Sequence, residues 1–340
     1  VIIGGMGTLY GGIIGAAFLK ITQTFLPDLQ SLAKDLFPEA VLLHNILERW
    51  LLLFGILFIL VVIFFPKGVI GSVKDRGASV LVSILRQQGI THILEDSSGN
   101  GGAAIAGYGA AAGIKVKVLV PETTSPAKVA QARAYGAEIE LIPGPREATE
   151  AAAITQAAEI LYASHNWHPF FLQGTKTLGY EIWEDLNFTV PNNIVIPASA
   201  GSNLLGCYLA FKELMASGET TRLPRLFVSQ PANCAPLHAS FQAGSDDFVE
   251  TEFGMTIAEG TAIKRPIRLK QMLDAVRESS GGTVAVAEED IARAALNLAA
   301  AGIYTEPTSA HAAAGFTQLI ASRQIDAAEE KVVILTGTGL

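Results

Sequence analysis

The sequence predicts an α/β fold with largely parallel sheets covered by helices, preceded by an α-helical membrane segment. After Gly77, short segments rich in valine and isoleucine alternate with segments of helical periodicity, an order typical of parallel sheets with helices on their faces. Before residue 74, by contrast, the chain contains a long apolar run without charged residues. The charges of the first 73 residues cancel, so the whole formal net charge of -8 lies in the second part.

Seven strands are expected in the second part, over residues 91–96, 115–120, 138–142, 193–197, 225–230, 282–286 and 331–335. Helices are expected between them, among them residues 78–88 and 127–135. The second of these carries signals for both helix ends, with Ser125 as N-cap, Pro126 at the first helical position and Gly136 as terminator. No internal repeat or low-complexity linker interrupts this order.

The first part is expected to be a membrane segment. Residues 50–65 are uncharged, and with Lys67 snorkelling they reach the roughly 20 residues that span a bilayer. Residues 1–19 carry no charge and have glycines at four-residue spacing, which favours a bundle of helices. These two runs, VIIGGMGTLYGGIIGAAFL and LLLFGILFILVVIFFPKGVIG, resemble the C-terminal end of permease subunits of branched-chain amino-acid ABC transporters. Basic residues after the second run would place the following segment in the cytoplasm.

Composition excludes several classes of partner. The acidic second part has no basic stripe, so nucleic acid is not expected as a partner. The two cysteines, Cys207 and Cys234, form neither a metal-ligand spacing nor a disulfide framework. No metal site is expected, and a reducing, cytoplasmic setting fits this cysteine usage best.

Four short segments combine small and hydroxyl-bearing residues at strand ends or helix starts, where α/β proteins bind ligands. They are residues 72–77 (SVKDRG), 96–100 (DSSGN), 197–203 (PASAGSN) and 335–340 (LTGTGL). The second and third follow a strand and open a helix, so their backbone N–H groups can face an anion. Each segment alone is compatible with an ordinary turn or terminus.

Together and in this order, the four segments resemble those of fold type II pyridoxal-phosphate enzymes, the tryptophan synthase β-subunit superfamily, and within it threonine synthase and its relatives. Supporting segments are Ala112-Gly113-Ile114, Gly174-Thr175-Lys176-Thr177, Ala258-Glu259-Gly260 and Glu306-Pro307-Thr308-Ser309-Ala310. The resemblance covers about residues 72–340 and implies two lobes, each with a parallel sheet. The smaller lobe would contain about 88–175 and the larger lobe about 72–87 with 176–340. Residues 1–71 would replace the usual N-terminal part.

The resemblance also implies roles for single residues. Lys74 would bind pyridoxal 5'-phosphate through a Schiff base, and its released amine would serve as a base for the substrate Cα proton. Asn100 would donate a hydrogen bond to the 3′-oxygen of the cofactor. The loop Ser97, Ser98 and Gly99 would receive the substrate carboxylate.

Two further segments would hold the other parts of the cofactor. The backbone N–H groups of the run Ala200, Gly201, Ser202 and Asn203, with the Ser202 hydroxyl, would bind its phosphate. Thr336 would face the pyridine nitrogen, where a neutral hydroxyl leaves the nitrogen unprotonated and suits elimination and replacement chemistry. Asp75 and Arg76 are expected to be mainly structural.

The sequence departs from the family's pattern in two places. Relatives carry Asn-Pro-Thr-Gly where this chain has residues 68–71 (GVIG), and Ser199 stands where a glycine is usual. The implied activity is that of a lyase of threonine synthase type, which converts O-phosphohomoserine and water to threonine and phosphate. The alternatives are another amino-acid dehydratase or β-replacement enzyme of the superfamily, a permease fragment joined to an inactive enzyme remnant, or an accidental join of two reading frames.

The partners follow from the same reading. The substrate would be a small amino acid, and the enzyme part would be a homodimer, as is usual for the family. The enzyme domain would lie in the cytoplasm, attached to the inner or plasma membrane through residues 1–66 if the first part is genuine.

Overall fold

The structure is a computed structural model that describes residues 73–97 and 99–337. Contacts divide the chain into residues 1–71 and residues 72–340, and the described residues all belong to the second unit. The predicted membrane segment, with its apolar run at 50–65, lies outside the described residues. Within 73–97 and 99–337, no helix is long and apolar enough to cross a bilayer.

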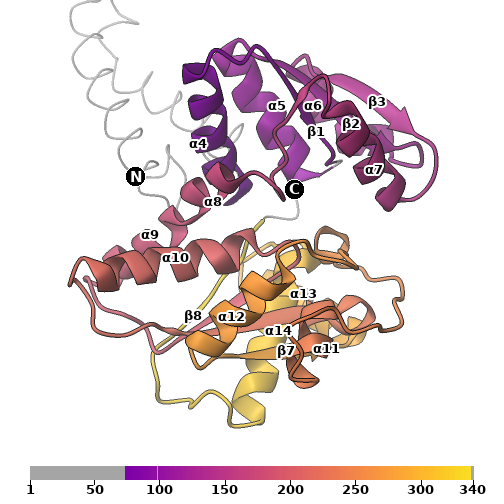
Figure 1. The fold of residues 1–340 in the computed structure, drawn as a ribbon. Coiled ribbons are helices and arrows are strands. Elements are labelled where there is room, and N and C mark those ends of the chain that lie inside the picture. The colour runs from indigo at the N-terminus through magenta and orange to yellow at the C-terminus, as the bar shows by residue number, and fades with distance from the viewer. Residues whose placement is uncertain (1–72, 98, 338–340) are drawn as a thin grey trace, which may run out of the picture. The chain divides into compact units, whose positions relative to one another are not determined.

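The first of two sheets has four parallel strands in the order β3-β2-β1-β4. The strands are β1 (His92–Glu95), β2 (Lys115–Pro121), β3 (Glu138–Ile142) and β4 (Leu161–Tyr162). The helices packed against this sheet are α4 (Val73–Gln87), α5 (Asn100–Ala112), α6 (Pro126–Ala134) and α7 (Arg146–Gln156). Figure 1 shows α4, α5 and α6 beside this sheet.

Successive side chains of each strand point to opposite faces of the sheet. Ile93 belongs to the core cluster that contains residues of α4, α5 and α6, whereas its neighbour Leu94 belongs to a smaller cluster with Ala153 of α7. Leu81 and Leu85 of α4 are fully buried in the first cluster. Helix α4 therefore packs with the first sheet, although residues 72–87 were expected to belong to the larger lobe; its amphipathic face has its apolar partners there.

The second sheet is also parallel, in the order β7-β6-β5-β8. Its strands are β5 (Asn193–Pro197), β6 (Arg225–Pro231), β7 (Gly282–Val286) and β8 (Lys331–Val333). Around it lie α10 (Ser202–Ala216), α11 (Pro236–Gln242), α12 (Leu269–Glu278), α13 (Glu288–Ala300) and α14 (Pro307–Ala321), with two short 3-10 helices, η2 (Ala232–Cys234) and η3 (Glu259–Thr261). Helices α8 (Pro169–Thr175) and α9 (Thr177–Asp185) connect the two sheets.

Helices cover both faces of the second sheet. Ile194 and Ile196 lie in the cluster that includes side chains of α10 and α12, and Val195 between them packs with Leu319 of α14. Burial of both faces of β5 explains why residues 194–196 are all apolar. The prediction of an α/β fold with parallel sheets is confirmed, and each predicted strand is present within two residues of its expected bounds. Strand β4 was not predicted, because it has two residues only.

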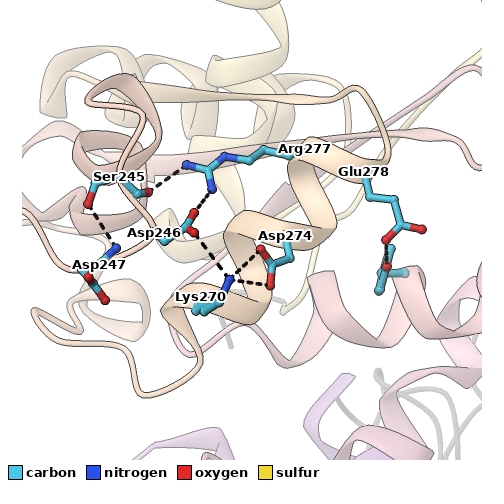
Figure 2. A network of polar contacts seen from close by, with 8 residues as sticks. Ser245, Asp246, Asp247, Lys270, Asp274, Arg277 and Glu278 are labelled. Atoms are coloured by element: carbon cyan, nitrogen blue, oxygen red, sulfur yellow. Dashed lines mark hydrogen bonds and ion pairs between the residues drawn. The ribbon is translucent and has the colours of Figure 1, made fainter.

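An exposed polar network joins the loop after α11 to α12 (Figure 2). Asp246 accepts a hydrogen bond from Arg277 and lies 3.6 Å from Lys270, which also pairs with Asp274 one turn further along the helix at 3.2 Å. Arg277 also donates to the backbone carbonyl of Ser245 at 2.8 Å. Exposed pairs of this kind contribute little to stability because solvent screens them.

Candidate active site

The strand order places two pairs of loops side by side. In each sheet the first strand along the chain has later strands on both of its sides, so the order reverses there: β1 lies between β2 and β4, and β5 lies between β6 and β8. Ligands of open parallel sheets bind outside the carboxyl ends of the strands at such reversal points. The loops after β1 and β4, and those after β5 and β8, are therefore the expected binding loops.

A cavity of about 520 Å³ lies among these loops. Its lining includes predicted site residues from all four segments: Lys74, Ser97, Gly99, Asn100, Gly201, Ser202, Asn203 and Thr336. Ala200 is buried and does not line the cavity, and Ser98 is not among the described residues. The structure thus brings together residues as far apart along the chain as Lys74 and Thr336, while the roles assigned to them stay predictions.

Lys74 projects from the first turn of α4. Burial lowers the pKa of its amine to about 8, although the charge of Glu95 opposes this shift; Arg146 adds to it. The Nζ atom lies 5.8 Å from the centroid of the Phe171 ring. A buried amine with a pKa of about 8 has a substantial neutral fraction near neutral pH, which is what nucleophilic attack on a carbonyl and proton abstraction require.

A buried ion pair fixes the start of α4. Arg76 donates to both carboxylate oxygens of Glu181 in α9, at 2.7 and 2.5 Å, and to the hydroxyl of Thr177 at 2.9 Å. Both charged side chains are about 5% exposed. Helix α8 approaches closely at this point, since a Cβ atom on Gly174 would lie 1.9 Å from the carbonyl oxygen of Arg76. Arg76 is thus structural, as expected, and holds Lys74 two residues away.

The loop after β1 turns tightly into α5. A Cβ on Gly102 would lie 2.0 Å from the carbonyl oxygen of Ser97, so this position requires glycine. The helix begins at Asn100 with no side-chain cap on its N-terminus. Its first N–H groups and the Ser97 hydroxyl therefore line the cavity as hydrogen-bond donors, suited to a carboxylate.

A second uncapped helix start belongs to α10. Gly201 precedes it with φ = +89°, a left-handed conformation, and a Cβ there would lie 2.3 Å from Sδ of Met272. The carbonyl of Ser202 accepts a hydrogen bond from the Thr175 hydroxyl at 2.9 Å, which ties α10 to α8. Asn203 Oδ1 is buried without a hydrogen-bond partner within the described protein. The turn thus presents unsatisfied N–H groups of a fifteen-residue helix to the cavity.

Ser309 at the start of α14 holds the loop that carries Thr336. The Ser309 hydroxyl oxygen accepts hydrogen bonds from the backbone N–H groups of Thr336 at 3.0 Å and Gly337 at 2.9 Å. It also lies 3.0 Å from the Thr336 hydroxyl. A Cβ on Gly337 would lie 3.7 Å from the side-chain nitrogen of Asn100, so the loops after β1 and β8 meet here.

A group of ionisable side chains beside the site was given no role by the sequence analysis. Glu95 ends β1 and Asp96 follows it, Arg146 begins α7, and His165 follows β4; Arg146 and His165 line the cavity, as do Glu259 and Glu306. Glu95 Oε1 lies 2.7 Å from His165 Nδ1, and the backbone N–H of His165 donates to Glu95 Oε2 at 3.1 Å. Arg146 pairs with Asp96 at 3.8 Å. Ligand atoms of Glu95, Asp96 and His165 lie within 4.8 Å of one another, close enough to share a metal ion. The imidazole already pairs with Glu95, however, and Arg146 already compensates the charge of Asp96.

Burial governs the protonation of this group. It raises the pKa of Glu95 to about 7, against the backbone hydrogen bond from His165 and the charges of Arg146 and Lys74. It also holds the pKa of His165 well below its usual value, and the nearby charge of Lys74 acts in the same direction. The imidazole is therefore neutral, and its Nδ1 shares a hydrogen bond of 2.7 Å with Glu95 Oε1.

The donor set fits pyridoxal 5'-phosphate. Lys74 offers an amine of suitable pKa, and the Gly201–Asn203 turn offers N–H groups for a phosphate. Asn100 offers an amide, and Thr336, whose backbone N–H is bound by the Ser309 hydroxyl, offers a neutral hydroxyl. Among the described lining residues the β8 loop contributes no carboxylate, but Glu306, which directly precedes α14, also lines the cavity, and a Cβ on Gly337 would lie 2.5 Å from its Oε1. All of these groups open on one cavity.

The comparisons with known proteins agree with this fit. The chain belongs to the family described as pyridoxal-phosphate dependent enzyme, which it matches over residues 67–337. It is therefore an enzyme of the pyridoxal-phosphate-dependent class, and pyridoxal 5'-phosphate is its cofactor. Because the match begins at residue 67, it gives no support to the permease resemblance of the first part.

Among curated relatives, threonine synthase of Methanosarcina acetivorans is 36% identical over 270 residues, which cover 78% of this chain and 67% of that protein. Threonine synthase of Halalkalibacterium halodurans is 32% identical over 273 residues, covering 79% and 74%. In fold, the chain is similar to the processed form of threonine deaminase isoform 2 from Solanum lycopersicum, with a TM-score of 0.69, 23% identity, and coverage of 81% and 73%.

Proposed function

We propose that the chain is a lyase of threonine synthase type, which converts O-phosphohomoserine and water to threonine and phosphate. One observation carries the proposal: Lys74, two uncapped helix starts and the hydroxyl of Thr336 open on a single cavity. The curated relatives that are 30% identical or more, and that are named threonine synthase, support this choice of reaction.

The cavity divides into parts that suit the two ends of this substrate. Ser97, Gly99 and the start of α5 would receive its carboxylate through hydroxyl and N–H donors. Arg146 is a second cation of the lining and would face the phosphate of the substrate. A phosphate-bearing amino acid would therefore have neutral hydrogen-bond donors for its carboxylate and a cation for its phosphate.

The residues of the chain would then bind and orient the cofactor and the substrate, and would transfer protons. When bound between Lys74, Asn100, the 200–203 turn and Thr336, pyridoxal phosphate supplies an electron sink for a carbanion next to the amino group. Lys74 would take the proton from Cα of the substrate, and proton loss at Cβ would precede departure of phosphate from Cγ. Cγ would take up the proton lost from Cβ and become the methyl group, and water would add its hydroxyl at Cβ while its other proton balances the charge of the released phosphate. Lys74 would return a proton to Cα, so that one phosphate leaves for each threonine formed.

The test uses the full chain with added pyridoxal phosphate. The proposal expects phosphate and threonine to form in equal amounts from O-phosphohomoserine, and K74A to form neither. The competing dehydratase function predicts a 2-oxo acid from serine or threonine instead. Release of a 2-oxo acid, with no phosphate released from O-phosphohomoserine, would refute the threonine synthase proposal and leave the dehydratase.

Three further expectations remain predictions. They are a homodimer of the enzyme part, membrane attachment through residues 1–66, and a cytoplasmic position of residues 72–340. Sedimentation of the expressed chain with membranes, compared with a chain that lacks residues 1–66, would test the attachment; equal recovery of both in the soluble fraction would speak against it.

A further inference from the structure

Glu95 is a fully buried carboxyl group at the end of β1, directly after the buried Ile93 and Leu94. Because side chains alternate along β1, Glu95 points to the same face of the sheet as Ile93, which belongs to the core cluster that also contains side chains of α4. Lys74 lies in the first turn of that helix. The fold therefore directs a buried carboxyl group toward the lysine that we assign to cofactor attachment.

The same carboxyl group makes two contacts to His165. Its Oε1 atom accepts from the imidazole at 2.7 Å and its Oε2 atom accepts from the backbone N–H at 3.1 Å. Both the imidazole and the Ser97 hydroxyl pack against Gly101, since a Cβ there would lie 3.0 Å from His165 Nδ1 and 3.1 Å from Ser97 Oγ. Glu95 thus fixes a ring that borders the loop for the substrate carboxylate.

Ionisable groups from several elements lie around Lys74. Glu95 ends β1 and Asp96 follows it, Arg146 begins α7, the neutral His165 follows β4, and Glu259 and Glu306 line the same cavity as Lys74. Buried charges must compensate one another, because each unpaired buried charge loses several kcal/mol of hydration free energy. Arg146 and Asp96 lie 3.8 Å apart, and Glu95 is the carboxylate whose charge raises the pKa of the amine.

We propose that Glu95 is a positioning residue for the cofactor lysine: its carboxylate orients His165 beside the substrate loop and stabilises the protonated amine of Lys74. This inference rests on the assignment of Lys74 to cofactor binding and not on the identity of the substrate. It is independent of whether the reaction is that of threonine synthase.

The direction of the effect follows from the signs of the charges. The pKa of Glu95 is about 7 and that of Lys74 about 8, so both groups are charged mainly between these two values. Replacing the carboxylate by a neutral amide removes a negative charge near the amine, which then loses its proton at a lower pH. Replacing Arg146 removes a positive charge, so the amine keeps its proton to a higher pH.

The experiment measures Lys74 directly in the full chain stripped of pyridoxal phosphate. The protein is labelled with a limiting amount of acetic anhydride at a series of pH values, and the fraction of acetylated Lys74 is read by mass spectrometry of its peptide. In E95Q we expect the midpoint of this titration to fall by about one pH unit, a shift typical of a lost neighbouring charge. In R146Q we expect the midpoint to rise.

The matched control is E140Q. Glu140 is a carboxylate of β3 in the same sheet, bound to Lys117 at 2.7 Å and absent from the cavity lining, so its loss is expected to leave the Lys74 midpoint unchanged. A merely structural role of Glu95 would not move the two cavity variants in opposite directions. An unchanged or raised midpoint in E95Q would overturn the proposal. If E95Q does not fold, R146Q decides, and an unchanged or lowered midpoint there would overturn it.

Discussion

Removal of the buried partner of Arg76 is expected to destabilise the enzyme part strongly. In E181A the guanidinium loses two charge-assisted hydrogen bonds, of 2.7 and 2.5 Å, at a place where both side chains are about 5% exposed. Hydrogen bonds to charged groups contribute about 1.5–3 kcal/mol each, and breaking a buried ion pair costs about 3–5 kcal/mol. We expect a loss of about 3–5 kcal/mol in the free energy of unfolding.

The assay is urea unfolding of the full chain, followed by far-ultraviolet circular dichroism in the presence of excess pyridoxal phosphate. With an m value of about 3 kcal/mol/M, the midpoint should fall by roughly 1 M or more. The double variant R76M/E181M should recover much of this loss, because it leaves no uncompensated charge in the core. D246N, in the exposed network of Figure 2, serves as the control and should shift the midpoint little, less still in high salt.

Two results would refute this reasoning. One is a midpoint of E181A within the experimental error of that of the unmodified chain, which would mean that the buried pair contributes nothing. The other is a double variant that is less stable than E181A, which would mean that the remaining charge is not the source of the cost. Because Lys74 lies two residues from Arg76, E181A should also bind the cofactor more weakly.

Three other predictions follow from the site. G201A should bind the cofactor more weakly and be less stable than G218A. In both variants a left-handed alanine costs about 1–2 kcal/mol, but a Cβ on Gly201 would also lie 2.3 Å from Sδ of Met272, whereas a Cβ on Gly218 meets nothing within 4 Å. Equal urea-unfolding midpoints of the two variants would contradict this. S309A should loosen the Thr336 loop, which loses two backbone hydrogen bonds at about 1 kcal/mol each, and cofactor titration should show weaker binding. Finally, the pKa of Glu95 is raised from 4.5 to about 7, so the stabilisation that its proton provides is present below pH 4.5 and is lost as pH rises to 7. Relative to E95Q, the free energy of unfolding of the unmodified chain should fall by about 3 kcal/mol across this pH range, as measured by urea unfolding. If the difference in free energy of unfolding between the two proteins does not change with pH, the raised pKa is refuted.

Much of the fold was predictable because its signals are local. Buried parallel strands such as 193–197 are apolar runs of ordinary length, and turn residues bound them. The loops after β1 and β5 carry small residues for reasons visible in the structure: Gly102 and Gly201 stand where a side chain would collide. Helix α4 was placed with the wrong sheet because its amphipathic pattern shows that one face is buried, but not which core buries it.

The ionisable residues of the site were not predictable by the same means. His165 follows a strand of two residues, too short to give a periodic signal, and meets Glu95 only because β1 and β4 are neighbours in the sheet. Arg146 is the first residue of α7, and a charged residue at a helix start gives no signal of its own for a binding site. Glu95 alone carried a usable signal: a carboxylate that ends an apolar strand directly before the DSSGN segment. A buried charge at such a place needs partners, and the sequence cannot name them.

The central claim is that Lys74 attaches pyridoxal phosphate in the cavity between the two sheets. Borohydride reduction of the full chain with bound cofactor, followed by peptide mass spectrometry, tests it directly. The account predicts one phosphopyridoxyl group on the peptide that contains Lys74, and none after reduction of K74A. A group on another lysine, or equal modification of K74A, would contradict it.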